Sequence, residues 1–168
     1  NHTAGAFLDI CIYGLNHEGI IQAIEDAIQR GVHVRFIGNA DGTLSLSDQS
    51  GAYYESYYRI AKALDTVFPS SEQRINYVPG TSEFDDFALL NTSGIMHHKF
   101  ILSTDNDNRD FVIAGSTNLT TSGIEQNNNN MLLIEDSSLL ATYRQQFEFY
   151  LGLSDASRVS TKANHTID

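Results

Sequence analysis

The N-terminal part of the chain alternates between apolar runs of strand length and a segment with helical periodicity. Residues 6–13 form a largely apolar run that Gly14 ends, which is typical of a strand covered on both faces. The apolar residues that follow repeat at helical spacing, with Asn16 as the expected N-cap and Gly31 beyond the last turn. Alternation over residues 32–37 predicts a second strand. This succession predicts a parallel strand pair joined by a right-handed crossover.

The rest of the chain has similar patterns with longer polar interruptions. The elements expected, in chain order, are a polar loop at 38–51, a helix at 52–68, a short strand at 75–78, an irregular segment at 79–94, a hairpin of strands at 99–103 and 111–114, a strand at 131–134, and a helix with Leu140, Tyr143, Phe147 and Tyr150 on one stripe. The irregular segment is interpreted as either a lid or a surface loop.

Together these elements predict an α/β fold with a mixed β-sheet flanked by helices on both faces. A length of 168 residues fits one domain with a substantial core. We expect this domain to span residues 1–153, and residues 154–168 to form a polar tail or linker that frays. The chain opens in Asn1 without an initiator Met and soon reaches a strand, so we expect it to be a piece of a longer protein.

Charge and composition limit the classes of substrate and partner that we expect. The net charge is −11, from 10 basic and 21 acidic residues, which is the wrong sign for neutralising the phosphates of a nucleic acid. This disfavours a nuclease without excluding one, because a small basic groove can lie on an acidic body. The fragment has neither an apolar run of the ~20 residues that span a membrane nor a signal pattern. It is expected to be soluble, with its compartment unknown, and Cys11 is expected to be a core residue.

The residues that can carry chemistry are His97-x-Lys99 and, after the hairpin, Gly115-Ser116-x-Asn118. In a strand His97 and Lys99 point to the same face, an unfavourable choice for a core. Facing a phosphate, Lys99 supplies positive charge and His97 a nucleophilic nitrogen. Ser116 and Asn118 are expected to add neutral donors to the same oxygens, and Gly115 to let backbone approach closely. A single His-x-Lys is common by chance, so the specificity comes from the pairing of the two motifs.

With these motifs the chain resembles the phospholipase D superfamily, whose signature runs His-x-Lys, Asp, then Gly-Ser-x-Asn or Gly-Gly-x-Asn. The segments "AIEDAIQRGVHVRFIG" and "MHHKFIL…VIAGSTNLTTSGIEQNNNNMLLIE" extend the resemblance over most of residues 6–135. It implies hydrolysis of a phosphodiester, or transfer such as transphosphatidylation, through a phosphohistidine and without a metal or another cofactor. It also implies that His97 attacks phosphorus or protonates the leaving oxygen, and that Lys99, Ser116 and Asn118 bind the phosphate.

Two positions depart from the signature. The signature Asp is expected where Thr104 stands, and Asp105 through a bulge, or Asp110 across the hairpin tip, would take its mainly structural role. Many members place a Glu after the Asn, hydrogen-bonded to the catalytic imidazole, and Asn129 holds that place here. An amide orients the ring but stabilises imidazolium less than a carboxylate does. Glu125 is the second candidate for this role.

The remaining histidines predict no metal site. His98 faces away from His97, and His98, His17 and His33 are expected to be packing or surface residues. No second His or Cys lies at ligand spacing, and the loop with Asp105 and Asp107 lacks the Gly and Glu of a calcium-binding loop.

Three functions remain open from the sequence. The first is a phospholipase D or phosphatidyltransferase, favoured by the acidic charge and by an apolar segment that could meet acyl chains, with Phe84, Phe87, Leu89 and Leu90. The second is a nuclease of the same superfamily acting as a homodimer. The third is a non-catalytic scaffold half, which the missing Asp and Glu would suit. The phosphodiester substrate is therefore expected to be a phospholipid rather than a nucleic acid.

The sequence contains one such motif, whereas attack and protonation occur on opposite sides of phosphorus. Members of the superfamily combine two motifs about a pseudo-twofold axis. The second half is expected either from a homodimer mate or from the rest of a longer chain, beyond Asp168.

Overall fold

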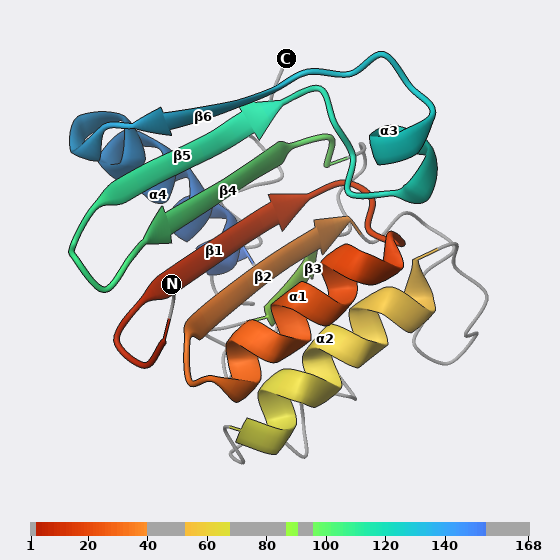
Figure 1. Ribbon diagram of the computed structural model, residues 1–168, viewed down its shortest axis with the longest axis horizontal. Coiled ribbons are helices and arrows are strands. Elements are labelled where there is room, and N and C mark those ends of the chain that lie inside the picture. The colour runs from red at the N-terminus through yellow and green to blue at the C-terminus, as the bar shows by residue number, and fades with distance from the viewer. Residues whose placement is uncertain (1–2, 40–52, 68–86, 91–95, 154–168) are drawn as a thin grey trace.

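A mixed sheet organises the fold (Figure 1). The structure is a computed structural model that describes residues 3–39, 53–67, 87–90 and 96–153. Within these residues the strands are β1 (Phe7–Ile12), β2 (His33–Asn39), β3 (Phe87–Leu90), β4 (Lys99–Thr104), β5 (Asp110–Gly115) and β6 (Met131–Glu135). Their order across the sheet is β3-β2-β1-β4-β5-β6. Strands β1 to β3 are parallel, and β4 to β6 are each antiparallel to the preceding strand in this order.

Helices lie on both faces of the sheet (Figure 1). Helices α1 (Glu18–Gln29) and α2 (Tyr54–Val67) pack side by side on one face, over the parallel strands, and α4 (Ser137–Leu153) lies on the other face. The short helix α3 (Thr121–Glu125) follows β5 at one end of the sheet. The α/β class predicted from the sequence is confirmed. Among the described residues no helix has the length and apolar character needed to cross a membrane.

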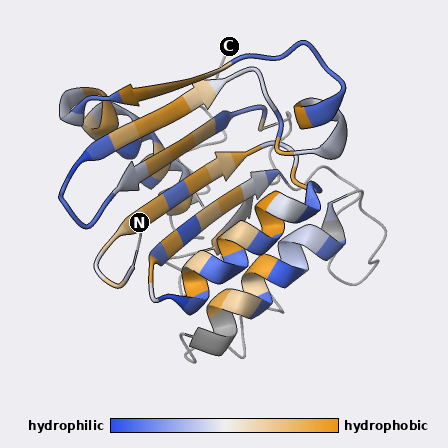
Figure 2. Ribbon diagram, in the orientation of Figure 1, coloured by the Kyte–Doolittle hydropathy of each residue, from blue (hydrophilic) through white to orange (hydrophobic). Residues whose placement is uncertain are grey.

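Apolar residues recur along the strands and helices (Figure 2), and the buried ones form two apolar cores. Ile10 and Ile12 face α1 and α2, whereas Cys11 between them faces α4, where burial raises the pKa of its thiol. The prediction that Cys11 is a core residue is confirmed. Strand β1 is therefore covered on both faces, as its continuous apolar run predicts.

Three local expectations are corrected by the structure. The N-cap of α1 is His17, whose Nδ1 accepts from the Ile20 N–H, while Asn16 instead accepts from the Thr121 N–H. Part of the segment expected to be irregular is strand β3, which pairs with β2 because its apolar residues complete the sheet beside that strand. Helix α3 was not predicted, because one turn carries too little periodicity. The strand expected at 75–78 and the tail from 154 lie outside the described residues.

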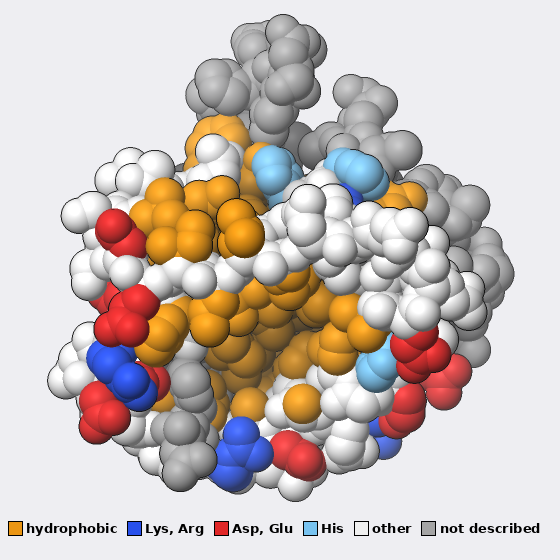
Figure 3. Space-filling view, turned by 45° about the horizontal axis from the view of Figure 1, so that its top comes forward, with side chains coloured by type: hydrophobic (Ala, Val, Ile, Leu, Met, Phe, Trp, Pro, Cys, Tyr) orange, Lys and Arg blue, Asp and Glu red, His pale blue; other side chains and the backbone are white. Residues whose placement is uncertain are grey.

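Strand β6 presents apolar side chains to solvent. Leu132 is 62% exposed and Leu133 67%, on opposite faces of the strand. On the α1 side, Leu133 continues a row with Ile113 and Ile101, because these three residues pair across β4, β5 and β6. Apolar side chains gather around a hollowed area of this face in Figure 3. Such a contiguous apolar surface is typical of an interaction site.

An ion pair fastens α4 to the centre of the sheet. The Asp9 carboxylate is fully buried and accepts two hydrogen bonds from Arg35, at 2.7 and 2.8 Å. Arg144 of α4 lies 3.4 Å from Asp9, and Arg35 also pairs with Glu148 of the same helix at 2.6 Å. A buried carboxylate is costly unless it is paired in this way, so Asp9 is expected to be sensitive to substitution.

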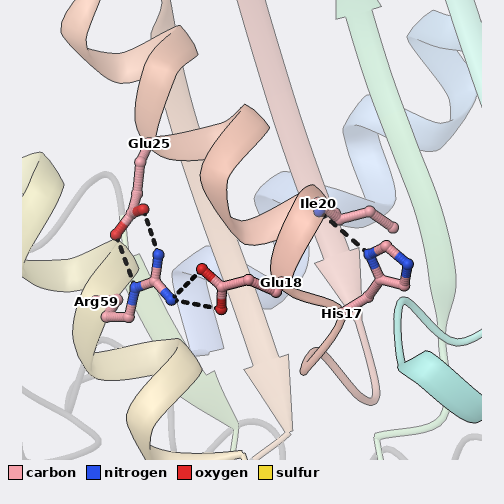
Figure 4. A network of polar contacts seen from close by, with 5 residues as sticks. All are labelled: His17, Glu18, Ile20, Glu25 and Arg59. Atoms are coloured by element: carbon pink, nitrogen blue, oxygen red, sulfur yellow. Dashed lines mark hydrogen bonds and ion pairs between the residues drawn. The ribbon is translucent and has the colours of Figure 1, made fainter.

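A second arginine joins α1 to α2 at the surface. Arg59 donates to Glu18 and to Glu25, with the closest contact 2.6 Å (Figure 4). The Glu18 side chain is 73% exposed, so water competes for this pair.

We predict that Asp9→Asn lowers the free energy of unfolding by about 3 kcal/mol, because it removes the buried charge that pairs with the half-buried Arg35 guanidinium and leaves that guanidinium only the exposed Glu148. Glu18→Gln is the matched control and is expected to cost about 0.5 kcal/mol or less. Urea unfolding followed by circular dichroism measures both. An equal loss of unfolding free energy in Asp9→Asn and Glu18→Gln would contradict the prediction that the Asp9 ion pair stabilises the fold more than the Glu18 pair.

Candidate active site

Three segments meet at one end of the sheet. Strands β1 and β5 end there and β4 begins there, so residues 13–17, 97–99 and 115–120 lie together (Figure 1). The Leu119 carbonyl accepts from the N–H groups of Asn16 and His17, which joins the segment after β5 to the one after β1. Phe100 pairs with Ala114, so Gly115 and Ser116 lie across from the start of β4. Both sequence motifs therefore reach the same end of the sheet.

His97 and Lys99 share the face predicted for them. The His97 ring meets the Tyr13 ring edge-on, with centroids 4.8 Å apart and planes at 66°. The Lys99 Nζ lies 5.4 Å from the centroid of the same ring and donates to the His97 carbonyl at 2.9 Å. His97 is exposed and Lys99 half-buried. An imidazole and an ammonium thus stand side by side where a ligand can reach them.

The electrostatics of this pair favour a neutral imidazole. Burial, and after it the charge of Lys99, lowers the pKa of His97 below its ordinary value. Burial also lowers the pKa of Lys99, but from an ordinary value of 10.5, so the ammonium remains charged near neutral pH. An unprotonated nitrogen beside a positive charge suits attack on an anionic phosphodiester.

Ser116 and Asn129 form one hydrogen-bonded unit. The Ser116 hydroxyl donates to the Asn129 Oδ1 at 3.2 Å and accepts from the Asn130 N–H at 3.1 Å. The Asn129 amide nitrogen donates in turn to the Gly123 carbonyl. Asn129 thus contacts Ser116 rather than the His97 ring among the interactions found in the described residues. This contact gives the amide a role in holding Ser116.

Asn118 is held by its neighbours in the chain and has an unsatisfied side chain. Its Oδ1 is buried without a hydrogen-bond partner among the described residues. A Cβ on Gly123 would lie 2.4 Å from the Asn118 carbonyl oxygen, so α3 can approach only because position 123 is glycine. Sequence reasoning missed Gly123, for which the only signal was a glycine shortly after the motif.

Gly115 lies where the neighbouring backbone leaves no room for a side chain. A Cβ at this position would lie 2.2 Å from the Asn130 carbonyl oxygen and 2.9 Å from the Met131 Cα. That carbonyl accepts from the Ser116 N–H and from the Thr117 hydroxyl. The absence of a side chain therefore lets the start of β6 approach the motif.

Asp105 lies at the opposite end of β4 and organises the hairpin tip. Its carboxylate accepts from the Arg109 and Asp107 N–H groups, and from the Arg109 guanidinium at 2.9 Å. The Arg109 backbone bond is the main cause that lowers the pKa of Asp105. Asp110, the runner-up, accepts from the Thr104 hydroxyl at 2.7 Å. Both contacts are structural.

The other candidates face elsewhere. Glu125 is exposed and its carboxylate lies 3.3 Å from the His17 Nε2, so its observed partner is not His97. His98 turns to the α4 side, where it hydrogen-bonds to the Tyr150 hydroxyl and packs on Phe100. Burial raises the pKa of that hydroxyl to about 12. In the described part of the chain, no group of three or more His, Cys, Asp or Glu side chains could hold a metal ion.

Tyr13 is the site residue that sequence reasoning did not identify. It follows β1 and lies far from the motifs in sequence, and a strand-end tyrosine in an apolar run gives no chemical signal. Only the pairing of β1 with β4 brings it against His97 and Lys99.

Comparisons with known proteins identify the family of the chain. Residues 2–151 match the family described as cardiolipin synthase, PLD-like domain. Mitochondrial cardiolipin hydrolase from Homo sapiens is 25% identical over 146 residues, which are 87% of this chain and 46% of the human protein. The mouse protein is 24% identical over 146 residues, covering 87% of this chain and 52% of its own length. The chain thus spans about half the length of these curated relatives.

Two solved structures share the fold. Nuc from Salmonella typhimurium, a phospholipase D family member, has a TM-score of 0.61 at 18% identity, over 88% of this chain and 79% of its own. NucT from Helicobacter pylori has a TM-score of 0.53 at 18% identity, over 86% and 78%. With the family match over residues 2–151, these findings establish that the chain belongs to the phospholipase D superfamily, in the family of cardiolipin synthase PLD-like domains.

Proposed function

We propose that this chain supplies one half of the active site of a phospholipase D-type phosphodiesterase, with His97 as the reacting group. The observation that carries the proposal is the exposed His97 imidazole, with its lowered pKa, beside the Lys99 ammonium at the strand ends where the Gly-Ser-x-Asn segment also lies. A non-catalytic scaffold half would have no need of this arrangement. Phosphodiester turnover by the parent assembly distinguishes the catalytic function from the scaffold function.

The proposed reaction has two steps. A ring nitrogen of His97 attacks phosphorus, and the bond from phosphorus to the leaving oxygen breaks as an acid on the far side protonates that oxygen. Water or an alcohol then attacks phosphorus and gives its proton to the same group, which is now deprotonated and acts as a base, while the phosphorus–nitrogen bond breaks and frees His97. Lys99, Ser116 and Asn118 are proposed to stabilise the charge on the phosphoryl oxygens.

We propose a phospholipid as the substrate in preference to a nucleic acid. The net charge of −11 opposes binding of a polyanion, and the apolar residues of β6 follow directly from the segment that holds Ser116. The names of the curated relatives, cardiolipin hydrolases, favour the same class. Phe87, which the sequence suggested could meet acyl chains, is instead buried in β3 against Phe36 and cannot do so. The side chains of Phe84, Leu89 and Leu90 lie outside the described residues.

The second half of the site is proposed to dock on the face with the apolar row of Ile101, Ile113 and Leu133. This row lies on the same face as Lys99, since residues two apart on β4 point alike. A second copy would bring its own His97 to the far side of phosphorus across an isologous interface. A second motif in a longer parent chain would do the same within one molecule.

We predict that His97→Ala in the parent assembly abolishes turnover, because the imidazole is needed for attack or for protonation of the leaving oxygen. Lys99→Met is expected to lower kcat by at least about a hundredfold through the lost charge. Assays on phosphatidylcholine vesicles and on single-stranded DNA measure both effects. Cleavage of DNA alone would refute the lipid preference, and activity of His97→Ala within tenfold of the unsubstituted protein would refute the assignment of His97.

We predict that the rate is the same with and without EDTA, because Lys99 and its counterpart supply the positive charge. The comparison uses protein dialysed against the chelator and then assayed with magnesium, with calcium or with neither. A rate that returns only when one of these ions is added would contradict metal independence.

We predict that an isolated monomer of this chain does not cleave phosphodiesters. The unsubstituted protein is mixed with increasing amounts of the His97→Ala protein. If two copies share one site, activity falls as the square of the fraction of unsubstituted chains. If both motifs lie in one parent chain, activity falls in direct proportion to that fraction. Sedimentation velocity on the same samples reports the oligomeric state. A strictly monomeric 168-residue chain with normal turnover would contradict the half-site proposal.

A further inference from the structure

We propose that Tyr13 is a positioning residue of this active site, whose ring holds the His97 imidazole and the Lys99 ammonium together. The proposal rests on the proposed function, because it concerns the geometry of the same site. Tyr13 belongs to neither sequence motif, and it reaches the site from the end of β1.

A single aromatic ring contacts both functional groups. The His97 ring meets it edge-on at a centroid distance of 4.8 Å, within the range of favourable aromatic pairs. The Lys99 Nζ lies 5.4 Å from the ring centroid, where the negative face of the ring attracts an ammonium. These two contacts fix the separation of nucleophile and charge without using the hydrogen-bonding atoms that a phosphate needs.

Tyr13 is itself held from three sides. Its N–H donates to the His98 carbonyl at 2.8 Å, and its carbonyl accepts from the Tyr57 hydroxyl at 2.9 Å. Its ring meets that of Tyr53 edge-on at 6.3 Å. Tyr57 is only 2% exposed, so this anchor belongs to the core between α2 and the sheet. The backbone of Tyr13 is therefore anchored at two points, and its ring contacts the Tyr53 ring as well as His97 and Lys99.

The contact with Tyr13 restricts the orientations available to the His97 imidazole. His97 is exposed, and an exposed side chain exchanges among rotamers, most of which do not align a ring nitrogen with phosphorus. Contact with the Tyr13 ring removes part of this freedom. It also keeps Lys99 close to the imidazole, whose pKa is lowered first by desolvation and second by the Lys99 charge.

The test compares Tyr13→Leu with Tyr13→Phe in the parent protein. The Leu variant lacks the ring, and we expect kcat to fall by about tenfold to a hundredfold while KM changes less than about threefold. The Phe variant keeps the ring and is expected to restore kcat to within about threefold of the unsubstituted protein. Tyr143→Leu is the matched control, because it removes an aromatic ring that packs on Phe100 on the α4 face of the sheet.

A second readout is the titration of His97 followed by NMR without substrate. In Tyr13→Leu the pKa of His97 is expected to rise toward its ordinary value, because burial and the proximity of Lys99 both weaken; Tyr13→Phe and Tyr143→Leu should leave it unchanged. If Tyr13→Leu fails to fold, Tyr13→Met serves in both measurements.

An unchanged kcat and titration in the ringless variant, or an equal loss of kcat in Tyr143→Leu, would overturn the proposal. The titration needs no turnover. If the protein cleaves no phosphodiester, only the proposed function is refuted. A shift of the His97 pKa in Tyr13→Leu would still support the positioning role of Tyr13.

Discussion

The hydrogen-bonded register between β1 and β4 is the constraint on which the site depends. Ile12 pairs with Lys99, and the Tyr13 N–H donates to the His98 carbonyl just beyond the strand pair. Because side chains alternate, this register turns His97 and Lys99 toward Tyr13 and turns His98 toward α4. A slip of one residue would reverse both faces and bring Lys99 against the apolar α4 core. The cores on either side of the sheet thus hold the reactive face in place.

Glycine at two positions lets the polar segment after β5 close on itself. Gly115 admits the backbone of Asn130, and Gly123 admits the Asn118 carbonyl, in each case where a Cβ would lie within 2.5 Å of backbone oxygen. The Ser116 hydroxyl then joins Asn129 and Asn130 across the turn. This loop, hydrogen-bonded within itself, lies across from the start of β4, where the phosphate is proposed to bind.

The charge of the chain and the charge of the site have opposite signs. The net charge is −11, yet the candidate site presents the Lys99 ammonium, and β6 presents exposed apolar side chains. An apolar surface beside a small positive site suits a substrate with one phosphodiester among apolar groups, and it also suits a second half that buries the same row.

The sequence by itself determined the α/β class, because strand and helix periodicities alternate strongly along it, and it selected His97, Lys99, Ser116 and Asn118 as the candidate site residues, because their spacing is specific. It did not determine strand β3, whose four residues carry too little pattern, or the cap of α1, where Asn16 bonds a distant backbone instead. Tyr13, Gly123 and the partner of Asn129 were decided only by tertiary structure. Their roles come from contacts between segments distant in sequence, or from close approach of backbone, and local sequence encodes neither.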